Sequence, residues 1–257
     1  MSAAPAVPAI AELQAPASWR AADVISDLHL QAGDPDTFEA WRRYMRQTPA
    51  DALFILGDLF DVWVGDDVAG EPGFAADCAA VLQAAAARLA VFFMHGNRDF
   101  LVGDGFLGAC RTTLLPDPTV LGFAGRRWLF THGDALCLAD TDYLHFRAQV
   151  RSPSWQREFL AKPLQERQAI ARDLRRQSEE RKRLGVQYPD VDGAAAVAWL
   201  DAADAQVLIH GHTHRPADHA LGERQRSVLS DWDAASTPQR LQALRLSAAG
   251  VQRVALS

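Results

Sequence analysis

The chain has 257 residues, of which 49% are hydrophobic and 23% are charged, and its formal net charge at pH 7 is −6. This composition is typical of a globular domain with a full hydrophobic core, and it excludes a disordered chain. No apolar run approaches the roughly 20 residues that span a bilayer, and an acidic chain is a poor general binder of nucleic acid.

Cysteine usage and the start of the chain bear on its compartment. The cysteines Cys78, Cys110 and Cys137 show no CxxC or Cys/His spacing, which argues against a disulfide framework and a structural zinc site. Residues 1–20 are rich in alanine and proline and lack the basic start and long apolar stretch of a signal peptide. We expect a flexible N-terminal arm, one domain over 21–257, and a cytoplasmic protein.

The predicted elements alternate between short apolar runs and helical stretches, a pattern typical of an α/β fold. Helices are predicted at 36–47 and 78–90, the second made largely of alanine, the best helix former. Five strands that end in polar residues or glycine are predicted at 22–30, 51–61, 90–100, 127–134 and 205–214. Shorter alternating runs near the end of the chain suit antiparallel strands at 226–232, 241–247 and 251–256.

The segment between the fourth and fifth strands, about 135–200, contains almost no β-branched runs. It predicts a helical insertion over the active face, with helices broken at Pro153, Pro163, Gly185 and Pro189. Residues 147–185 carry eleven Arg and Lys residues against five Asp and Glu residues, a net charge of +6. Such a segment suits an anionic ligand or an anionic membrane surface. For the predominantly polar helix predicted at 165–183, a solvated basic face is the alternative.

Each of the five predicted strands ends in a possible metal ligand. The stretch LIHGHTHRP at 208–216 carries three histidines at alternate positions, which favours a metal site over a polar strand end. Carboxylate, imidazole and amide ligands together suit Mn²⁺, Fe²⁺ or Zn²⁺. Seven ligands are too many for one ion, so we predict two ions that share a bridging carboxylate. The predicted ligands are Asp27, His29, Asp58, Asn97, His132, His212 and His214.

In this order, the motifs D-x-H, GD, GN, HG and GHxH resemble those of the calcineurin-like metallophosphoesterases. The resemblance implies two packed mixed β-sheets flanked by helices, with a dinuclear site at the strand ends. It implies that one ion is held by Asp27, His29, Asp58 and His214. It implies that the other ion is held by Asn97, His132, His212 and the bridging Asp58. His210 and His95 match no ligand position, and we expect them to support the ligands.

The stretch GNRD has Arg98 where many relatives carry the histidine of GNHE. Arginine cannot donate a proton near neutral pH, but it clamps phosphate with two parallel hydrogen bonds. A leaving group that is itself a phosphate, with a second pKa of about 6, departs without a general acid. The sequence therefore favours a diphosphate over a phosphomonoester substrate. The alternative is that Arg98 only pairs with Asp99.

Longer stretches resemble the UDP-2,3-diacylglucosamine diphosphatases of the lipid A pathway: ILGDLFDVWVGDD (55–67), HGNRDFLVG (95–103), LLPD (114–117), HGDALC (132–137) and HGHTHRP (210–216). The resemblance implies hydrolysis of UDP-2,3-diacylglucosamine to UMP and 2,3-diacylglucosamine 1-phosphate. It also implies two Mn²⁺ ions and a peripheral position on the anionic cytoplasmic face of the inner membrane. Asp58, Asn97 and Arg98 would act in catalysis. The implied substrate contacts are Asn97, Arg98, Asp140, Ser178, Lys182, Arg183 and His212.

The predicted insertion offers groups for both halves of such a substrate. For the acyl chains it offers Trp155, Phe159, Leu160, Leu164 and Ile170. For the anionic groups it offers Arg175, Arg176, Lys182 and Arg183. Two rival functions stay open: a metallophosphoesterase acting on dinucleotide polyphosphates or cyclic nucleotides, and a metal-dependent scaffold without catalysis. We expect no nucleic-acid partner, and a monomer is favoured.

Overall fold

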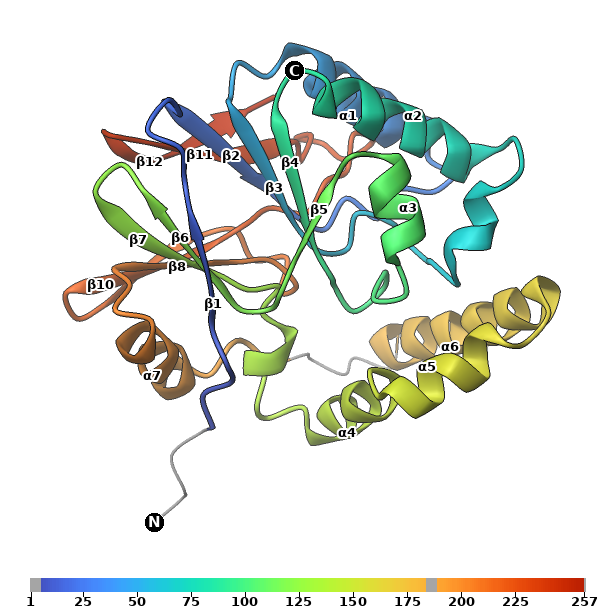
Figure 1. Cartoon of the computed structure of the whole chain (residues 1–257). Coiled ribbons are helices and arrows are strands. Elements are labelled where there is room, and N and C mark those ends of the chain that lie inside the picture. The colour runs from blue at the N-terminus through green and yellow to red at the C-terminus, as the bar shows by residue number, and fades with distance from the viewer. Residues whose placement is uncertain (1–5, 184–188, 257) are drawn as a thin grey trace.

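Two six-stranded mixed sheets pack face to face in the computed structural model, and helices cover their outer faces (Figure 1). The structure describes residues 6–183 and 189–256, except for the side chains of 177–179 and 181–183. One sheet consists, in spatial order, of β12 (Gly250–Ala255), β11 (Gln242–Ser247), β2 (Ala21–Ile25), β3 (Ala52–Leu56), β4 (Ala90–Met94) and β5 (Thr113–Leu115). Strands β2 to β5 run parallel, and β11 pairs antiparallel with β2 and β12.

The second sheet consists, in spatial order, of β1 (Ala11–Gln14), β6 (Thr119–Phe123), β7 (Arg126–Phe130), β8 (Val207–His210), β10 (Arg224–Val228) and β9 (Asp218–Leu221). Strands β7, β8 and β10 run parallel, while β6 and β9 pair antiparallel with β7 and β10. Parallel β3 and β4 read as continuous apolar runs because both faces of this sheet are covered, whereas β2 also carries the buried Asp23.

The core between the sheets is rich in aromatic rings. Phe54 of β3 stacks on Phe92 of β4 with ring centroids 4.8 Å apart, and Phe130 of β7 lies 5.0 Å from Phe54. Residues of both sheets therefore form one buried cluster, which also contains Trp128. This core fixes the two sheets, and hence the ends of their strands, relative to each other.

Helices α1 (Pro35–Gln47), α2 (Phe74–Ala86) and α3 (Asp104–Ala109) cover the outer face of the β3 sheet (Figure 1). Helix α1 begins where sequence chemistry places it, because the Asp34 carboxylate accepts the Thr37 N–H at 3.1 Å and Pro35 is the first helical residue. Its apolar face buries Trp41 and Met45.

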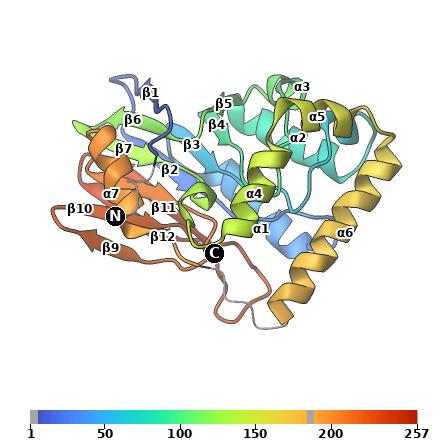
Figure 2. The same cartoon turned by 90° about the horizontal axis from the view of Figure 1, so that it is seen from below.

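Three further helices gather at the end of the sheets: α4 (Thr141–Val150), α5 (Pro153–Leu160) and α6 (Leu164–Arg183). Figures 1 and 2 show them together at that end, with α6 extending along one side of the molecule. Helix α7 (Gly193–Ala202) lies apart from them and packs Trp199 and Leu200 on the outer face of the β8 sheet. The expected insertion at 135–200 was therefore too long, because α7 belongs to the core.

The expected flexible arm is wrong for Ala11–Gln14, which forms β1 and pairs in parallel with β6. Trp19 also packs edge-on against two core rings, Phe54 and Phe92. The sequence AELQ carries no strand signal of its own, so the open edge of β6 decides its structure. The strands β5, β6 and β9 were also missed, and each is only three to five residues long.

Two other predictions need correction. Helix α2 begins at Phe74, four residues before the predicted start. The run at 226–232 was expected to be antiparallel, but β10 is parallel to β8 and antiparallel only to β9. Strands β11 and β12 form the antiparallel pair that their alternation predicts.

Candidate metal centre

Five strands direct their carboxyl ends to one place between the sheets. Because β2, β3 and β4 are parallel in one sheet and β7 and β8 in the other, polar residues that follow them meet at one edge. All seven predicted ligands lie there. They are Asp27 and His29 after β2, Asp58 after β3, Asn97 after β4, His132 after β7, and His212 and His214 after β8.

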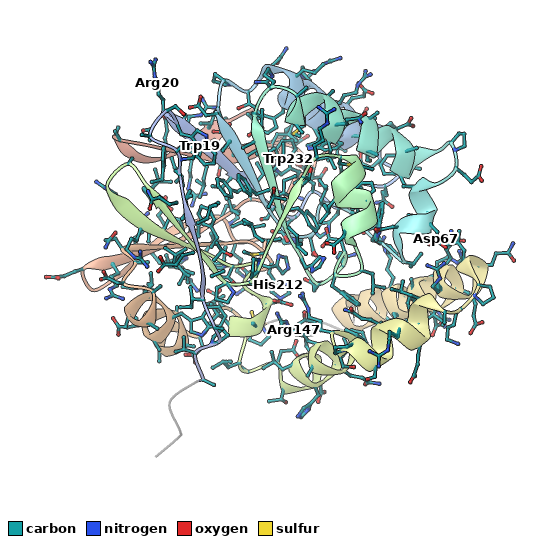
Figure 3. All side chains as sticks on the ribbon, viewed as in Figure 1. Trp19, Arg20, Asp67, Arg147, His212 and Trp232 are labelled. Carbon is teal, nitrogen blue, oxygen red and sulfur yellow. The ribbon has the colours of Figure 1, made fainter. Side chains whose placement is uncertain are left out.

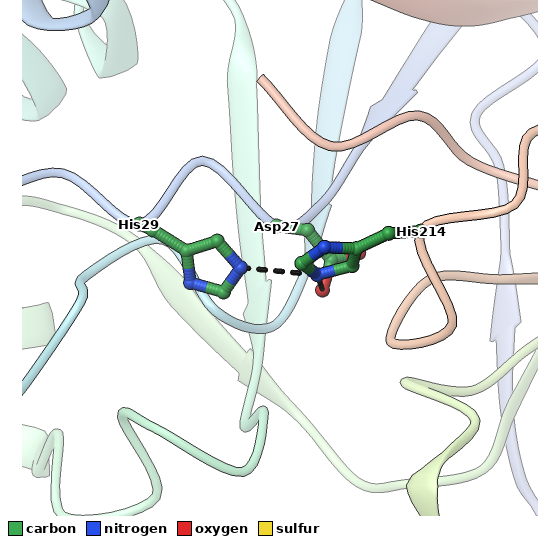
Figure 4. A group of neighbouring side chains, drawn as sticks. All are labelled: Asp27, His29 and His214. Carbon is green, nitrogen blue, oxygen red and sulfur yellow. Dashed lines mark hydrogen bonds and ion pairs between the residues drawn. The ribbon is translucent and has the colours of Figure 1, made fainter. Parts of the chain in front are cut away.

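Asp27, His29 and His214 form the first group of ligand atoms (Figure 4). The Nε2 atoms of His29 and His214 face each other at 3.1 Å, and His214 Nε2 lies 3.4 Å from Asp27 Oδ1. Two imidazole nitrogens at this spacing match neighbouring ligands that are each about 2.1 Å from one ion. The group therefore fits a divalent cation.

Asn97 is the centre of the second group. Its Oδ1 atom lies 2.9 Å from His132 Nε2 and 2.8 Å from His212 Nδ1. His132 donates its Nδ1 proton to the Leu56 carbonyl at 2.8 Å, which leaves Nε2 directed into the site. Carbonyl oxygen and imidazole nitrogen converging in this way suit a second cation.

Two carboxylates connect the groups. Asp27 belongs to both clusters whose ligand atoms lie within 4.8 Å of one another, the second being Asp27, Asp58 and His132. Asp58 places Oδ1 3.8 Å from His132 Nε2 and Oδ2 3.9 Å from His29 Nδ1. Both carboxylates are buried, so their negative charge acts within the site.

The backbone around the ligands is strained. Left-handed conformations cost roughly 1–2 kcal/mol for residues with a Cβ, and such strain persists where the surrounding fold enforces it. Among the described residues, eight non-glycine residues have positive φ, and five of these are predicted ligands: Asp27 (55°), His29 (49°), Asp58 (53°), His212 (66°) and His214 (52°).

Glycines let the chain approach the carboxylates closely. A Cβ on Gly96 would lie 2.1 Å from Asp58 Oδ1, and a Cβ on Gly211 would lie 2.2 Å from Asp27 Oδ2. Backbone N–H groups therefore orient these carboxylates, because His212 N donates to Asp27 Oδ2 at 2.9 Å and Arg98 N donates to Asp58 Oδ1 at 2.8 Å. The residues beside the motif ligands thus have a defined physical role.

The electrostatics of the site favour added positive charge. Burial lowers the pKa of His132, but Asp58, Asp134 and Asp27 outweigh it and raise this pKa to about 9. Burial and the charge on His132 lower the pKa of His212 to about 3. Burial opposes ionisation of Asp27, yet the hydrogen bond and charge of His214 hold its pKa well below the usual range. The surrounding carboxylates therefore stabilise a positive charge at the His132 ring, and a metal cation at Nε2 could supply that charge in place of a proton.

Arg98 lies beside the ligands. Its Nη1 atom is 2.9 Å from Asp61 Oδ1, and its Nε atom is 3.8 Å from Asp58 Oδ2. Asp99 turns inward and accepts the Leu59 N–H at 2.8 Å, so the alternative of a simple Arg98–Asp99 pair is wrong.

The sequence reasoning missed a buried anchor at Asp134. Its Oδ2 atom accepts hydrogen bonds from Tyr143 Oη at 2.5 Å and Arg147 Nε at 2.8 Å, both on α4. The Tyr143 ring stacks on His212 with centroids 5.9 Å apart, and Figure 3 shows His212 and Arg147 close together at this end of the sheets. Asp134 directly follows the HG motif, and this position was the available signal.

The remaining predicted residues are placed as follows. Asp140 caps α4 by accepting the Tyr143 N–H at 3.2 Å. His210 is buried with Nδ1 2.8 Å from the Gly211 carbonyl, and His95 Nε2 lies 2.7 Å from the Val102 carbonyl, so both contact loops that carry ligands. The side chains of Ser178, Lys182 and Arg183 lie outside those that the structure describes.

A cavity of about 440 Å³ adjoins Asp61. Its apolar lining comes largely from the segment after β3, and its basic lining comes from α6. The lining includes Phe60, Trp63, Val64, Val68, Phe74, Arg172 and Arg175. The residues expected to contact acyl chains lie elsewhere: Leu160 is exposed, and the others pack against the core beneath α1 to α3, namely Trp155, Phe159, Leu164 and Ile170.

Residues 22–216 match the calcineurin-like phosphoesterase family, so the chain belongs to this class of hydrolases and the predicted fold is confirmed. Within this class, proteins named UDP-2,3-diacylglucosamine hydrolase are similar over most of their length. The one from Chromobacterium violaceum is 46% identical, with 81% of this chain and 89% of that protein covered. The corresponding values are 45%, 81% and 84% for Bordetella pertussis, and 43%, 81% and 89% for Cellvibrio japonicus. The resemblance to this family is therefore confirmed.

Proposed function

We propose that the protein hydrolyses the diphosphate bond of UDP-2,3-diacylglucosamine to UMP and 2,3-diacylglucosamine 1-phosphate, in lipid A biosynthesis. One observation carries the proposal: the seven predicted metal ligands and the Arg98 guanidinium converge at the strand ends. The names of the similar proteins support the choice of substrate.

The proposed cofactor is a pair of Mn²⁺ ions. Asp27, His29, Asp58 and His214 would hold one, and Asn97, His132, His212 and Asp58 the other. Bound ions of this kind supply Lewis acidity, which lowers the pKa of water and polarises the phosphoryl group. The mixed oxygen and nitrogen donors suit Mn²⁺, Fe²⁺ or Zn²⁺, and the choice of Mn²⁺ among them follows the family resemblance.

Arg98 would bind the diphosphate and stabilise the charge that develops on it as water attacks the α-phosphorus in line. The leaving group is a phosphate, so no side chain has to protonate it. This agrees with the surroundings of Arg98, where carboxylates rather than a proton donor lie next to the guanidinium. The further proposed substrate contacts are Asn97, His212, Asp140, Ser178, Lys182 and Arg183.

The cavity beside Asp61 would accept acyl chains, because its apolar lining adjoins the basic side chains of α6. We also propose peripheral contact with the anionic cytoplasmic face of the inner membrane. Basic residues of 147–185 and exposed apolar side chains on α4, α5 and α6 support it, namely Phe146, Leu160 and Leu174. Over the described residues, none of the helices is long and apolar enough to cross a bilayer.

Incubation of the purified protein with UDP-2,3-diacylglucosamine and Mn²⁺ in H₂¹⁸O tests the reaction. The label should appear in UMP, and Asp58→Ala should abolish turnover without a comparable loss of folded protein. Label in the lipid product would refute attack at the α-phosphorus. A strong preference for dinucleotide polyphosphates or cyclic nucleotides would favour the rival hydrolase, and absence of turnover on any phosphoester would favour the scaffold.

A further inference from the structure

Asp61 connects the metal centre to helix α6. Its side chain is almost fully buried, and its Oδ1 atom lies 2.9 Å from Nη1 of Arg98. Its Oδ2 atom forms an ion pair with Nη1 of Arg175, which lies on α6. Each carboxylate oxygen therefore has a guanidinium partner from a different part of the chain.

The backbone fixes where this carboxylate lies. Asp61 follows the predicted ligand Asp58 by three residues, and its N–H donates to the Leu30 carbonyl at 3.1 Å, just after β2. A buried carboxylate is costly unless cations pair with it, so Asp61 holds both guanidinium groups in place. The position of Arg98 is therefore set by the same two strand exits that carry the metal ligands.

Asp58 is the other carboxylate with which Arg98 can pair. Asp58 Oδ2 already lies 3.8 Å from Arg98 Nε. Without the Asp61 charge, the guanidinium would move towards Asp58 and compete for a carboxylate that the metal centre requires. With Asp61 in place, Nη1 is occupied and the remaining N–H groups of Arg98 are available to a phosphate.

We propose that Asp61 is a positioning residue that aligns Arg98 for the reaction and couples this alignment to α6 through Arg175. The inference rests on the proposed function. Asp61 itself does not contact the reacting atoms. Asp61 contributes to the rate by orienting the Arg98 guanidinium. A displacement of such a group by about 1 Å lowers the rate by about a hundredfold.

The chain offers a matched control in Asp67. Asp67 accepts a hydrogen bond from Arg167 Nη1 at 2.9 Å, and Arg167 also lies on α6. Both aspartates thus join α6 to the segment after β3 through an arginine, but only Asp61 also contacts Arg98. Asp67→Asn weakens the attachment of α6 without changing the surroundings of Arg98.

Measurement of kcat, KM and Tm with Mn²⁺ tests the inference in the wild type and in Asp61→Asn, Asp61→Glu and Asp67→Asn. We expect Asp61→Asn to lower kcat at least about tenfold while KM changes less than about threefold. Asp61→Glu keeps the charge and should recover most of kcat, and Asp67→Asn should keep kcat within about twofold. If Asp61→Asn matches Asp67→Asn, or raises only KM, the inference is wrong.

A crystal structure of the Asp61→Asn variant gives a readout that needs no substrate. The Arg98 guanidinium should shift towards Asp58 in this variant and stay in place in Asp67→Asn. An unmoved guanidinium would overturn the positioning role whatever the substrate is. Failure of the wild type to release UMP would instead overturn the proposed function, so the two failures are distinguishable.

Discussion

Replacement of Gly96 by alanine should impair metal binding, because the added methyl group would collide with Asp58. The new Cβ would lie 2.1 Å from Asp58 Oδ1 and 2.3 Å from the Asp58 backbone nitrogen. Because normal carbon–oxygen contacts are about 3.5 Å, the carboxylate has to move by more than about 1 Å. A backbone atom is involved as well, so a change of side-chain rotamer cannot relieve the contact.

The size of the effect follows from that displacement. A 1 Å error in a reacting geometry costs about a hundredfold in rate, and disturbed ligand orientation costs about 10- to 100-fold in metal affinity. We expect Gly96→Ala to weaken Mn²⁺ binding and to lower kcat by about a hundredfold. Calorimetric titration with Mn²⁺ and UMP release at saturating Mn²⁺ measure the two effects.

Gly108 provides the control, because a Cβ there meets nothing within 4 Å and the residue lies in α3. Gly108→Ala should leave activity unchanged and stabilise the fold by about 0.5 kcal/mol, since glycine is costly inside helices. Full activity and wild-type Mn²⁺ affinity in Gly96→Ala would refute the reasoning that this close approach fixes the Asp58 carboxylate.

Three other outcomes are expected. Arg98→Lys should lower the rate of UMP release about tenfold, because lysine cannot make the paired hydrogen bonds of a guanidinium, and an unchanged rate would contradict this. Mn²⁺ affinity should fall about tenfold per pH unit below the His132 pKa of about 9, since a proton must leave before the metal binds, and titrations at several pH values measure it. Trp19→Ala should lower the free energy of unfolding by about 2 kcal/mol in denaturant titrations, because the ring packs on Phe54 and Phe92. Unchanged stability would favour the expected flexible arm.

The convergence of the seven predicted ligands could be foreseen from the sequence because its signal is local. An apolar run predicts a buried strand, and the polar residue after it lies at the carboxyl end of that strand. Asp58 and Asn97 follow two adjacent parallel strands, and this topology alone brings them to one edge. The contacts of Asp61 and Asp134 could not be predicted in this way. Arg175 lies on α6, far along the chain from Asp61, and Arg147 follows Asp134 by only 13 residues but meets it because of how α4 packs in the folded chain.

Strand β1 was missed and α7 was assigned to the insertion because both depend on the rest of the fold. Strand β1 exists because β6 presents an unpaired edge, and α7 belongs to the core because the β8 sheet needs cover. Both facts concern surfaces that exist only after folding. Four of the five residues expected to contact acyl chains pack against the core, and their burial could not be seen in the local sequence.

Three consecutive residues in the loop after β4, Asn97 to Asp99, direct their side chains to three different sets of partners. Asn97 points to His132 and His212, the Arg98 side chain points to Asp61, and Asp99 points inward to the Leu59 N–H. Asp99 also accepts the Gly96 N–H at 2.9 Å, so it fixes the start of the loop and the exit of β3 to each other. Because Arg98 N donates to Asp58, the Asn97 amide oxygen, the Arg98 guanidinium and the carboxylate of the predicted ligand Asp58 share one rigid frame. The arginine can therefore remain next to a metal ligand without displacing the cation that this ligand would hold.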